Sequence, residues 1–194
     1  MNDPYFKKRI EYSLKREEFK FDTSQLLFST FEVDVGTQFL LRNLIDKVGN
    51  PASILDLGCG SGVIGIVLAH FFPQAQVVLS DKDLLAVRYT RHNAEVNNVP
   101  NVQVVGGVGI EAVADRSYDL IVSNIPAKIG DEAIEQDFVL GPYNLLTPGG
   151  AYWSVVVSQL NRLLPGLGRK HALRMHEVAK RPGHTIYKIV KPAE

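Results

Sequence analysis

The sequence has very little cysteine and no long hydrophobic run, and each scarcity excludes a class of protein. Its 194 residues include one cysteine, Cys59, which cannot form a disulfide within the chain. Such scarcity is typical of proteins in a reducing compartment, so we expect a cytoplasmic location. The longest apolar stretch, VIGIVLAHFF, is about half a membrane span and contains Gly65 and His70. This stretch is too short to cross a membrane, so we expect no membrane span. Because the first residues, MNDPYFKKRIEY, are polar, we also expect no signal peptide.

Two kinds of catalytic site also find no support in the sequence. A serine in a Gly-x-Ser-x-Gly elbow is absent. The histidines are scattered without metal-ligand spacing and are accompanied by a single cysteine, so we expect no metal site. They are His70, His92, His171, His176 and His184.

The formal net charge is zero, but the charges are unevenly distributed along the chain. Residues 1–20 contain 6 Lys/Arg and 4 Asp/Glu, and residues 161–194 contain 8 and 2. The intervening segment, 21–160, contains 7 Lys/Arg and 15 Asp/Glu. Basic terminal segments of this kind can bind the phosphates of a nucleic acid. They are equally compatible with solvated helix faces and strand edges.

Apolar periodicity predicts an α/β protein. From residue 52 onward, short apolar runs alternate with segments of helical spacing, which favours a mostly parallel sheet with helices on both faces. A closing antiparallel hairpin is expected around the turn at 181–183. We therefore predict one domain, 1–194, in which a basic helix and an extended lead-in (1–36) precede the core (37–194). The seven expected strands span residues 53–57, 75–80, 102–107, 118–124, 151–157, 171–180 and 184–191.

A glycine-rich turn, DLGCGSGVIG, follows the first strand of this core. Gly60, Gly62 and Gly65 match the spacing of a dinucleotide-binding fingerprint, and Asp81 follows at the distance that fingerprint requires. Asp56, however, would repel a pyrophosphate and would suit the ammonium group of a methionine moiety. Asp81 can accept hydrogen bonds from ribose hydroxyls in either case, or it can simply cap the next helix. A purely structural glycine turn is the remaining alternative.

Taken in order, these segments resemble the small methyltransferase domain family, whose best-known members are 16S ribosomal RNA guanine-N2 methyltransferases. Phe28-Ser29 followed by Asp34-Val35-Gly36-Thr37 resembles the family's lead-in, and ILDLGCGSGVIGI resembles its S-adenosylmethionine (SAM) motif. YDLIVSNIPA stands where the family has a strand ending in Asn-Pro-Pro-aromatic. The resemblance implies a Rossmann-like class I methyltransferase fold with SAM as cofactor and RNA, ribosomal RNA in particular, as substrate.

The resemblance also implies which residues bind the cofactor. Val108 stands where relatives often have an Asp that holds the adenine amino group, so backbone groups such as the amide of Gly109 would read the adenine. The full set of expected cofactor-binding residues is Thr37, Asp56, Gly58, Cys59, Gly60, Gly62, Asp81, Lys82, Val108 and Gly109.

The acceptor loop implied by the family departs from its pattern at two positions. Asn124 and Pro126 are retained, while Ile125 replaces the first proline and keeps its carbonyl. Such a loop holds an amine by its two N–H groups, so that positioning and electrostatics supply most of the rate. Ala127 replaces the aromatic residue that stacks on a base, and stacking of this kind is worth about 1–3 kcal/mol.

Other residues can complete the acceptor site. We expect Phe28 or Tyr143 to supply the stacking ring and Lys128 a phosphate contact. Alternatively, the loop is only a helix entry in which Asn124 bonds its own backbone.

The sequence and the resemblance thus predict a SAM-dependent methyltransferase that modifies an amine nitrogen, guanine N2 of ribosomal RNA in particular. Three alternatives remain open. The same fold can modify a protein glutamine or a small metabolite, it can be a non-catalytic SAM- or RNA-binding relic, or the glycine turn can bind a nicotinamide cofactor.

Overall fold

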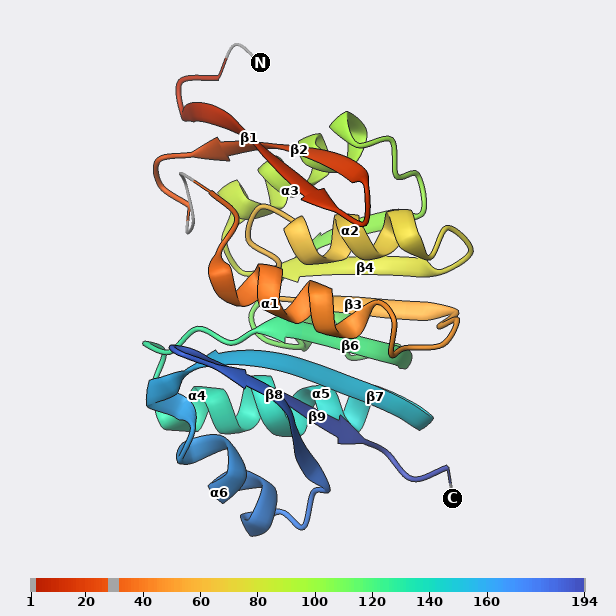
Figure 1. Cartoon of the computed structure of the whole chain (residues 1–194), viewed down its shortest axis with the longest axis vertical. Helices are drawn as coiled ribbons and strands as arrows, with labels where there is room; N and C mark the ends of the chain where they lie inside the picture. Colours follow the sequence, from red (N-terminus) through yellow and green to blue (C-terminus); the bar gives the residue numbers. More distant parts are fainter. Residues whose placement is uncertain (1–2, 28–31, 194) are drawn as a thin grey trace.

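The computed structural model describes residues 3–27 and 32–193. Its larger sheet has the strand order β5-β4-β3-β6-β7-β9-β8 (Figure 1). Strands β3 to β7 pair in parallel, whereas β9 is antiparallel to both β7 and β8. This confirms the predicted seven-stranded, mostly parallel sheet with a C-terminal antiparallel hairpin. The strands are β3 (Ser53–Leu57), β4 (Gln76–Asp81), β5 (Val102–Gly106), β6 (Tyr118–Asn124), β7 (Leu146–Val157), β8 (Met175–Arg181) and β9 (His184–Val190).

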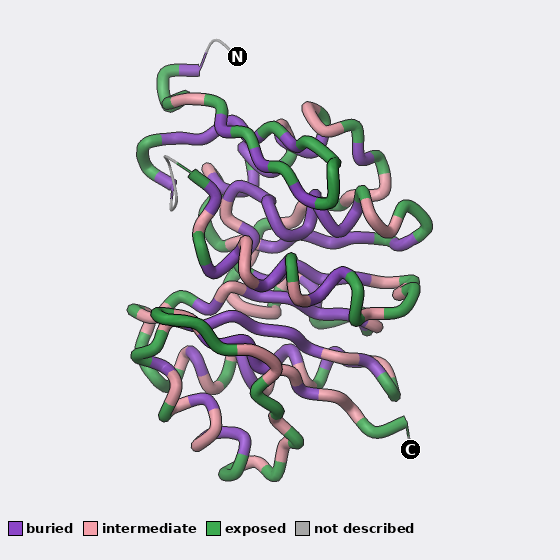
Figure 2. Tube along the Cα trace, in the orientation of Figure 1, coloured by how far each residue is buried: buried purple, intermediate pink, exposed green. Residues whose placement is uncertain are grey.

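Helices cover both faces of this sheet, and each face has its own apolar core. The first three helices lie on one face, together with the N-terminal hairpin, and the others lie on the opposite face. Buried residues therefore follow the central strands and the inner sides of the helices (Figure 2). The helices are α1 (Val35–Leu44), α2 (Val63–Phe71), α3 (Leu84–Val96), α4 (Asp131–Glu135), α5 (Gly141–Leu145) and α6 (Leu163–Lys170). Shorter turns are η1 (Glu111–Val113), a π turn η2 (Gln136–Leu140) and η3 (Ser158–Leu160).

The basic helix predicted at the N-terminus is wrong, because this segment forms an antiparallel hairpin of β1 (Phe6–Leu14) and β2 (Glu17–Ser24). Ile10, Tyr12 and Leu14 are buried while the residues between them are exposed, which is the period of a strand. The two turn residues, Lys15 and Arg16, have φ of 52° and 71°. Such turns usually carry Asn-Gly, so no local sequence pattern indicates a hairpin here.

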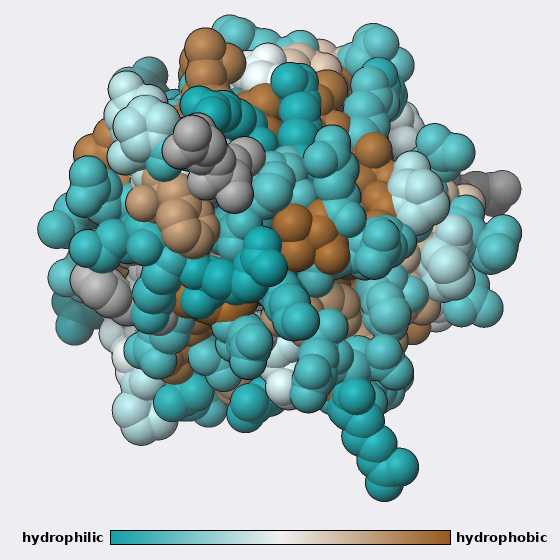
Figure 3. Space-filling model, turned by 90° about the horizontal axis from the view of Figure 1, so that it is seen from above, coloured by the Kyte–Doolittle hydropathy of each residue, from teal (hydrophilic) through white to brown (hydrophobic). Residues whose placement is uncertain are grey.

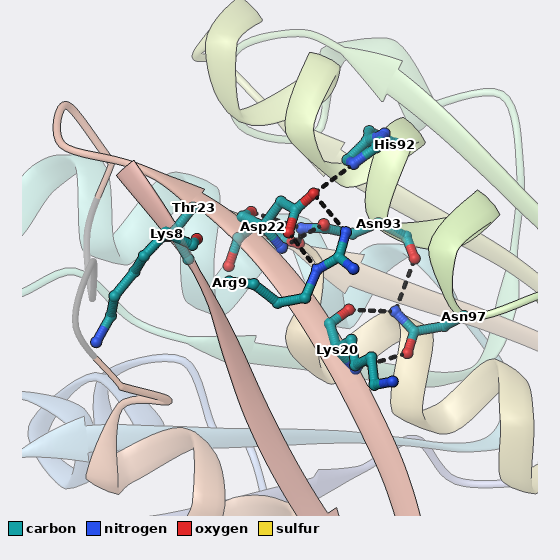
Figure 4. A network of polar contacts seen from close by, with 9 residues as sticks. Lys8, Arg9, Lys20, Asp22, Thr23, His92, Asn93 and Asn97 are labelled. Carbon is teal, nitrogen blue, oxygen red and sulfur yellow. Dashed lines mark hydrogen bonds and ion pairs between the residues drawn. The ribbon is translucent and has the colours of Figure 1, made fainter. Parts of the chain in front are cut away.

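The hairpin is held to the core by two asparagines, Asn93 in α3 and Asn97 just after this helix (Figure 4). Asn93 is fully buried; its Oδ1 accepts from the backbone N–H of Asp22 at 2.8 Å, and its Nδ2 donates to Asp22 O at 3.1 Å. Asn97 forms the same pair of bonds with the backbone of Lys20, at 2.9 and 2.7 Å. Asn93 Nδ2 also donates to Ser61 O at 2.9 Å. A single amide therefore joins the hairpin to the glycine turn.

The side chain of Asp22 adds an ionic contact to the same junction. Its carboxylate accepts from Arg9 Nε at 2.6 Å and lies 2.7 Å from His92 Nε2. The hydrogen bond from Arg9 is the main cause that holds the pKa of Asp22 below its usual range. Seen from the hairpin side, the surface is mostly hydrophilic, with hydrophobic residues in separate patches (Figure 3).

Replacing Asn93 with leucine should lower the free energy of unfolding by about 3 kcal/mol, because the change leaves three buried backbone groups without partners. A urea titration measures this difference. The matched control is Asn50→Ala, at an exposed asparagine, for which we expect a change below about 0.5 kcal/mol. Equal free energies of unfolding for the two variants would show that Asn93 does not stabilise the packing of the hairpin on the core.

Candidate active site

The glycine turn lies at the carboxyl edge of the sheet, between β3 and α2. Gly58, Gly60 and Gly62 have φ of 74°, 56° and 86°, a region that only glycine enters without strain. The N–H of Gly58 donates to Ser80 O at 2.8 Å, which holds the turn against the end of β4. No atom lies within 4 Å of the place where a Cβ on Gly60 would stand. Gly60 therefore faces open space at the point where a ligand would approach the backbone.

Asp81, the last residue of β4, is held in place by the backbone on both sides. Its Oδ2 accepts from the N–H of Gly60 at 2.8 Å, and its Oδ1 accepts from the N–H of Asp83 at 2.9 Å. Asp83, not Asp81, caps α3, because its side chain accepts from the N–H of Leu85. The helix-cap alternative for Asp81 is therefore wrong, and each carboxylate oxygen keeps a lone pair for a further donor.

Asp56 lies completely buried beneath the glycine turn. Its Oδ2 accepts from the N–H of Gly65 at 2.8 Å, while Oδ1 has no partner among the described residues. Burial is the main cause that raises the pKa of Asp56 to about 7, and the negative charge of Asp81 adds to it. A buried carboxylate with one unpaired oxygen would be stabilised by a cation.

Two neighbours of these carboxylates differ in their exposure. Cys59 is buried 3.7 Å from Thr90 Oγ1, and burial raises the pKa of its thiol well above the usual value. The thiol is therefore not a nucleophile near neutral pH. Lys82 is exposed at the end of β4.

Asn124, at the end of β6, is oriented by two residues at the start of α1. Its Nδ2 donates to Asp34 Oδ2 at 2.8 Å and lies 3.2 Å from Thr37 Oγ1. Asp34 Oδ2 also accepts from the N–H of Thr37 at 3.0 Å, which caps α1. A carboxylate can only accept, so the amide must turn its nitrogen toward Asp34 and its oxygen away. In the described part of the chain, that oxygen accepts no hydrogen bond.

This arrangement assigns Asp34 a role that the sequence did not reveal. In the sequence, Asp34 stands out only as part of the family's lead-in, whereas in the structure its carboxylate caps α1 and also anchors Asn124. Thr37 lies in the same cluster, and its expected contact with the cofactor stays a prediction. The alternative in which Asn124 bonds only its own backbone is wrong.

The rest of the acceptor loop is exposed or packed on the core. Ile125 is buried, and its N–H donates to Val155 O at 3.0 Å. Pro126 and Lys128 are exposed, whereas Ala127 packs against the apolar core beside α4. Phe28, one candidate for a stacking ring, lies outside the described residues.

Tyr143 cannot supply that ring, because it lies at the opposite edge of the sheet. It precedes the amino end of β7, where its ring lies 5.8 Å from Lys191 Nζ. A cavity of about 310 Å³, whose lining includes Ser53, Gln76 and Tyr118 at the amino ends of the strands, lies at that edge too. The acceptor loop and the glycine turn are at the carboxyl edge, so neither Tyr143 nor this cavity belongs to the site.

The loop after β5 lies beside Asp81, because the N–H of Gly107 donates to Asp81 O at 3.1 Å. Val108 is 55% exposed and its side chain offers no acceptor atom. Gly109 has φ of 53°, and the described structure gives its N–H no hydrogen-bond acceptor. This N–H can therefore donate to a ligand, as the sequence predicts for adenine.

These features fit the groups of SAM. The unpaired oxygen of Asp56 suits an ammonium, the carboxylate of Asp81 suits ribose hydroxyls, and Gly60 leaves room for close approach. The described residues contain no group of three or more His, Cys, Asp or Glu placed to hold a metal ion. No helix in the described ranges is both long and apolar enough to cross a membrane.

The sheet order and the glycine turn at its carboxyl edge define a Rossmann-like α/β protein with the methyltransferase fold. The 16S rRNA N2 G1207 methyltransferase of T. thermophilus, solved with AdoMet and guanosine, shares this fold with a TM-score of 0.81. It is 24% identical in sequence, and the match covers 95% of this chain and 50% of that one.

The family model for the methyltransferase small domain matches residues 18–188, and the chain belongs to this family. Ribosomal RNA small subunit methyltransferase C of Hahella chejuensis is 37% identical over 163 residues, which are 79% of this chain and 44% of that protein. Protein YbxB of Bacillus subtilis, described as uncharacterized, is 29% identical over 95% of this chain and 92% of its own length. The chain thus spans less than half the length of the named rRNA methyltransferase.

Proposed function

We propose that this protein is a SAM-dependent methyltransferase that transfers a methyl group to an exocyclic amine of an RNA base, guanine N2 of ribosomal RNA in particular. The observation that carries the proposal is the orientation of Asn124, whose oxygen is left free for a donor by the contact with Asp34. The family membership and the names of the rRNA methyltransferase relatives support the same reaction. Ribosomal RNA as substrate implies a cytoplasmic location.

The cofactor would be held by residues already in position. Asp56 would pair with the ammonium group of the cofactor, and Asp81 would accept hydrogen bonds from its ribose hydroxyls. The backbone at Gly58 and Gly60 would lie along the part of the cofactor that links these two groups. When bound, SAM supplies a methyl group on a sulfonium, which is already a good leaving group.

The chain's own contribution to the reaction is positioning. Asn124 Oδ1 would accept one N–H of the amine, and the carbonyl of Ile125 would accept the other. Both acceptors belong to a loop held by Asp34 and by the N–H bond from Ile125 to Val155. Because the amine nitrogen is fixed by two hydrogen bonds, its approach to the methyl group costs little further entropy. No strong general base is required.

Exposed cations surround this edge of the sheet and suit an RNA backbone. Lys82 follows β4, Lys128 follows β6, and Arg162 follows β7 and η3. Arg181 ends β8 at the same edge, because the neighbouring His184 pairs with Val157, the last residue of β7. Lysine and arginine at this edge would contact phosphates and make binding weaken with salt.

Two measurements test the proposal. Calorimetric titration with S-adenosylhomocysteine (SAH) should give a dissociation constant near micromolar, about −8 kcal/mol, with no heat from NADH. Radiolabelled SAM should then transfer its methyl group to bulk RNA, and treating the RNA with nuclease beforehand should abolish the signal. Failure to bind SAH would overturn the proposal. Tight binding of SAH without methyl transfer to any extract would also overturn it, and would indicate a non-catalytic SAM-binding protein instead.

One observation favours a second acceptor class. Ala127 packs on the core and presents no ring, so a side-chain amide such as a protein glutamine would lose nothing at this loop. Methyl transfer that survives nuclease but not protease treatment of the extract would establish this alternative.

A further inference from the structure

The π turn η2 follows the acceptor loop and contacts the glycine turn and the loop after β5 at once. Phe138 Cε1 lies 3.6 Å from the place where a Cβ on Gly58 would stand. Asp137 Oδ1 lies 2.5 Å from the corresponding place on Gly109. Since π turns insert one residue into a helix and occur frequently at functional sites, this turn is a candidate wall of the cofactor site.

Asp137 is a half-buried carboxylate with no partner of its own. Its side chain forms no hydrogen bond or ion pair within residues 3–27 and 32–193. Nearby Glu135, by contrast, lies 2.6 Å from both Lys170 Nζ and His171 Nε2. A half-buried charge without a partner leaves acceptor capacity that a ligand can use.

The backbone beside this carboxylate is shaped to let it approach. Gly109 has φ of 53°, and any side chain there would collide with Asp137. Asp137 therefore lies directly against the residue whose N–H has no acceptor in the described structure. The result is a donor and an acceptor side by side.

We propose that Asp137 reads the adenine ring of the cofactor, accepting from the N6 amino group while the N–H of Gly109 donates to N1. This inference rests on the proposed function. The adenine edge carries a donor at N6 and an acceptor at N1, which is the complement of this pair. Hypoxanthine carries the opposite pattern and would meet two mismatches. Asp137 thus supplies, from a different element, the acceptor that Val108 lacks.

Calorimetry with two ligands tests the proposal on the full chain. The probes are SAH and S-inosylhomocysteine, in which an oxygen replaces the adenine amino group. Wild-type protein should prefer SAH by about 10- to 100-fold, the range expected for a hydrogen bond to a charged group. Asp137→Asn should lose most of this preference and bind S-inosylhomocysteine more tightly than wild type does, because its amide can either accept from the amino group or donate to the oxygen.

The matched control is Asp131→Asn, which removes one negative charge from an exposed position six residues earlier. It should leave both affinities unchanged. If Asp137→Asn keeps the wild-type affinities and an unchanged unfolding midpoint, the inference is overturned while the proposed function stands. If wild-type protein binds neither ligand, the proposed function fails and the inference fails with it.

Discussion

Replacing Asp34 with alanine should lower kcat for methyl transfer about 10- to 100-fold while the affinity for SAH stays unchanged, because the change removes a charge-assisted hydrogen bond worth about 1.5–3 kcal/mol. Asp34 Oδ2 is 2.8 Å from Asn124 Nδ2, and no other carboxylate among the described residues contacts that amide. Without this anchor, the amide can rotate and present its nitrogen to the substrate amine, where donor would face donor.

Two further variants separate orientation from simple loss of stability. Asp34 also caps α1, and losing the cap costs about 1 kcal/mol of stability. Asp34→Ser retains a capping oxygen but is too short to reach Asn124, so it should remain stable and have a low kcat. Asp34→Asn places an acceptor oxygen at the same position and should recover much of the rate. If kcat follows the unfolding midpoint across the three variants, Asp34 is only a structural residue.

Replacing Asp56 with asparagine should weaken SAH binding by about 100-fold, because a buried charge partner of the ammonium is lost. The amide of asparagine can still accept from the N–H of Gly65, so the glycine turn should keep its shape. Wild-type affinity should also rise with pH. With a pKa of about 7, Asp56 is mostly protonated at pH 6 and mostly ionised at pH 8, which gives about a tenfold gain in affinity.

Stability should change with pH in the opposite direction. Burial raises the folded pKa of Asp56 to about 7 from a usual value of about 3.9, so the folded state holds a proton that the unfolded state releases between these values. This contribution is fully present below about pH 4 and is lost as pH rises through 7. Asp56→Asn should therefore be more stable than wild type at pH 8 by about 4 kcal/mol, because each pKa unit corresponds to about 1.4 kcal/mol. Urea titrations at pH 5 and pH 8 measure this difference, and parallel profiles for the two proteins would contradict it.

The N-terminal hairpin shows why the sequence misled at one point. The stretch from Tyr5 to Phe19 carries apolar residues at spacings compatible with a helix, and its turn lacks the glycine that usually marks a hairpin. What selects strands is the burial of alternate residues against the core and the pairing of Asn93 and Asn97 with the backbone of β2. These are contacts with a helix about 70 residues away, and no local pattern records them.

From residue 52 onward, the sequence by itself determined the order of strands and helices along the chain, the glycine turn and the edge of the sheet where Asp56, Asp81 and Asn124 converge. Those features are local: apolar periodicity selects each element, and parallel strands necessarily end at one edge. Only the tertiary structure decided that Asp34 orients Asn124 across 90 residues of chain, and that Asp137 lies against Gly109. The reason is physical, since each pair joins segments brought together by the packing of whole elements on the sheet.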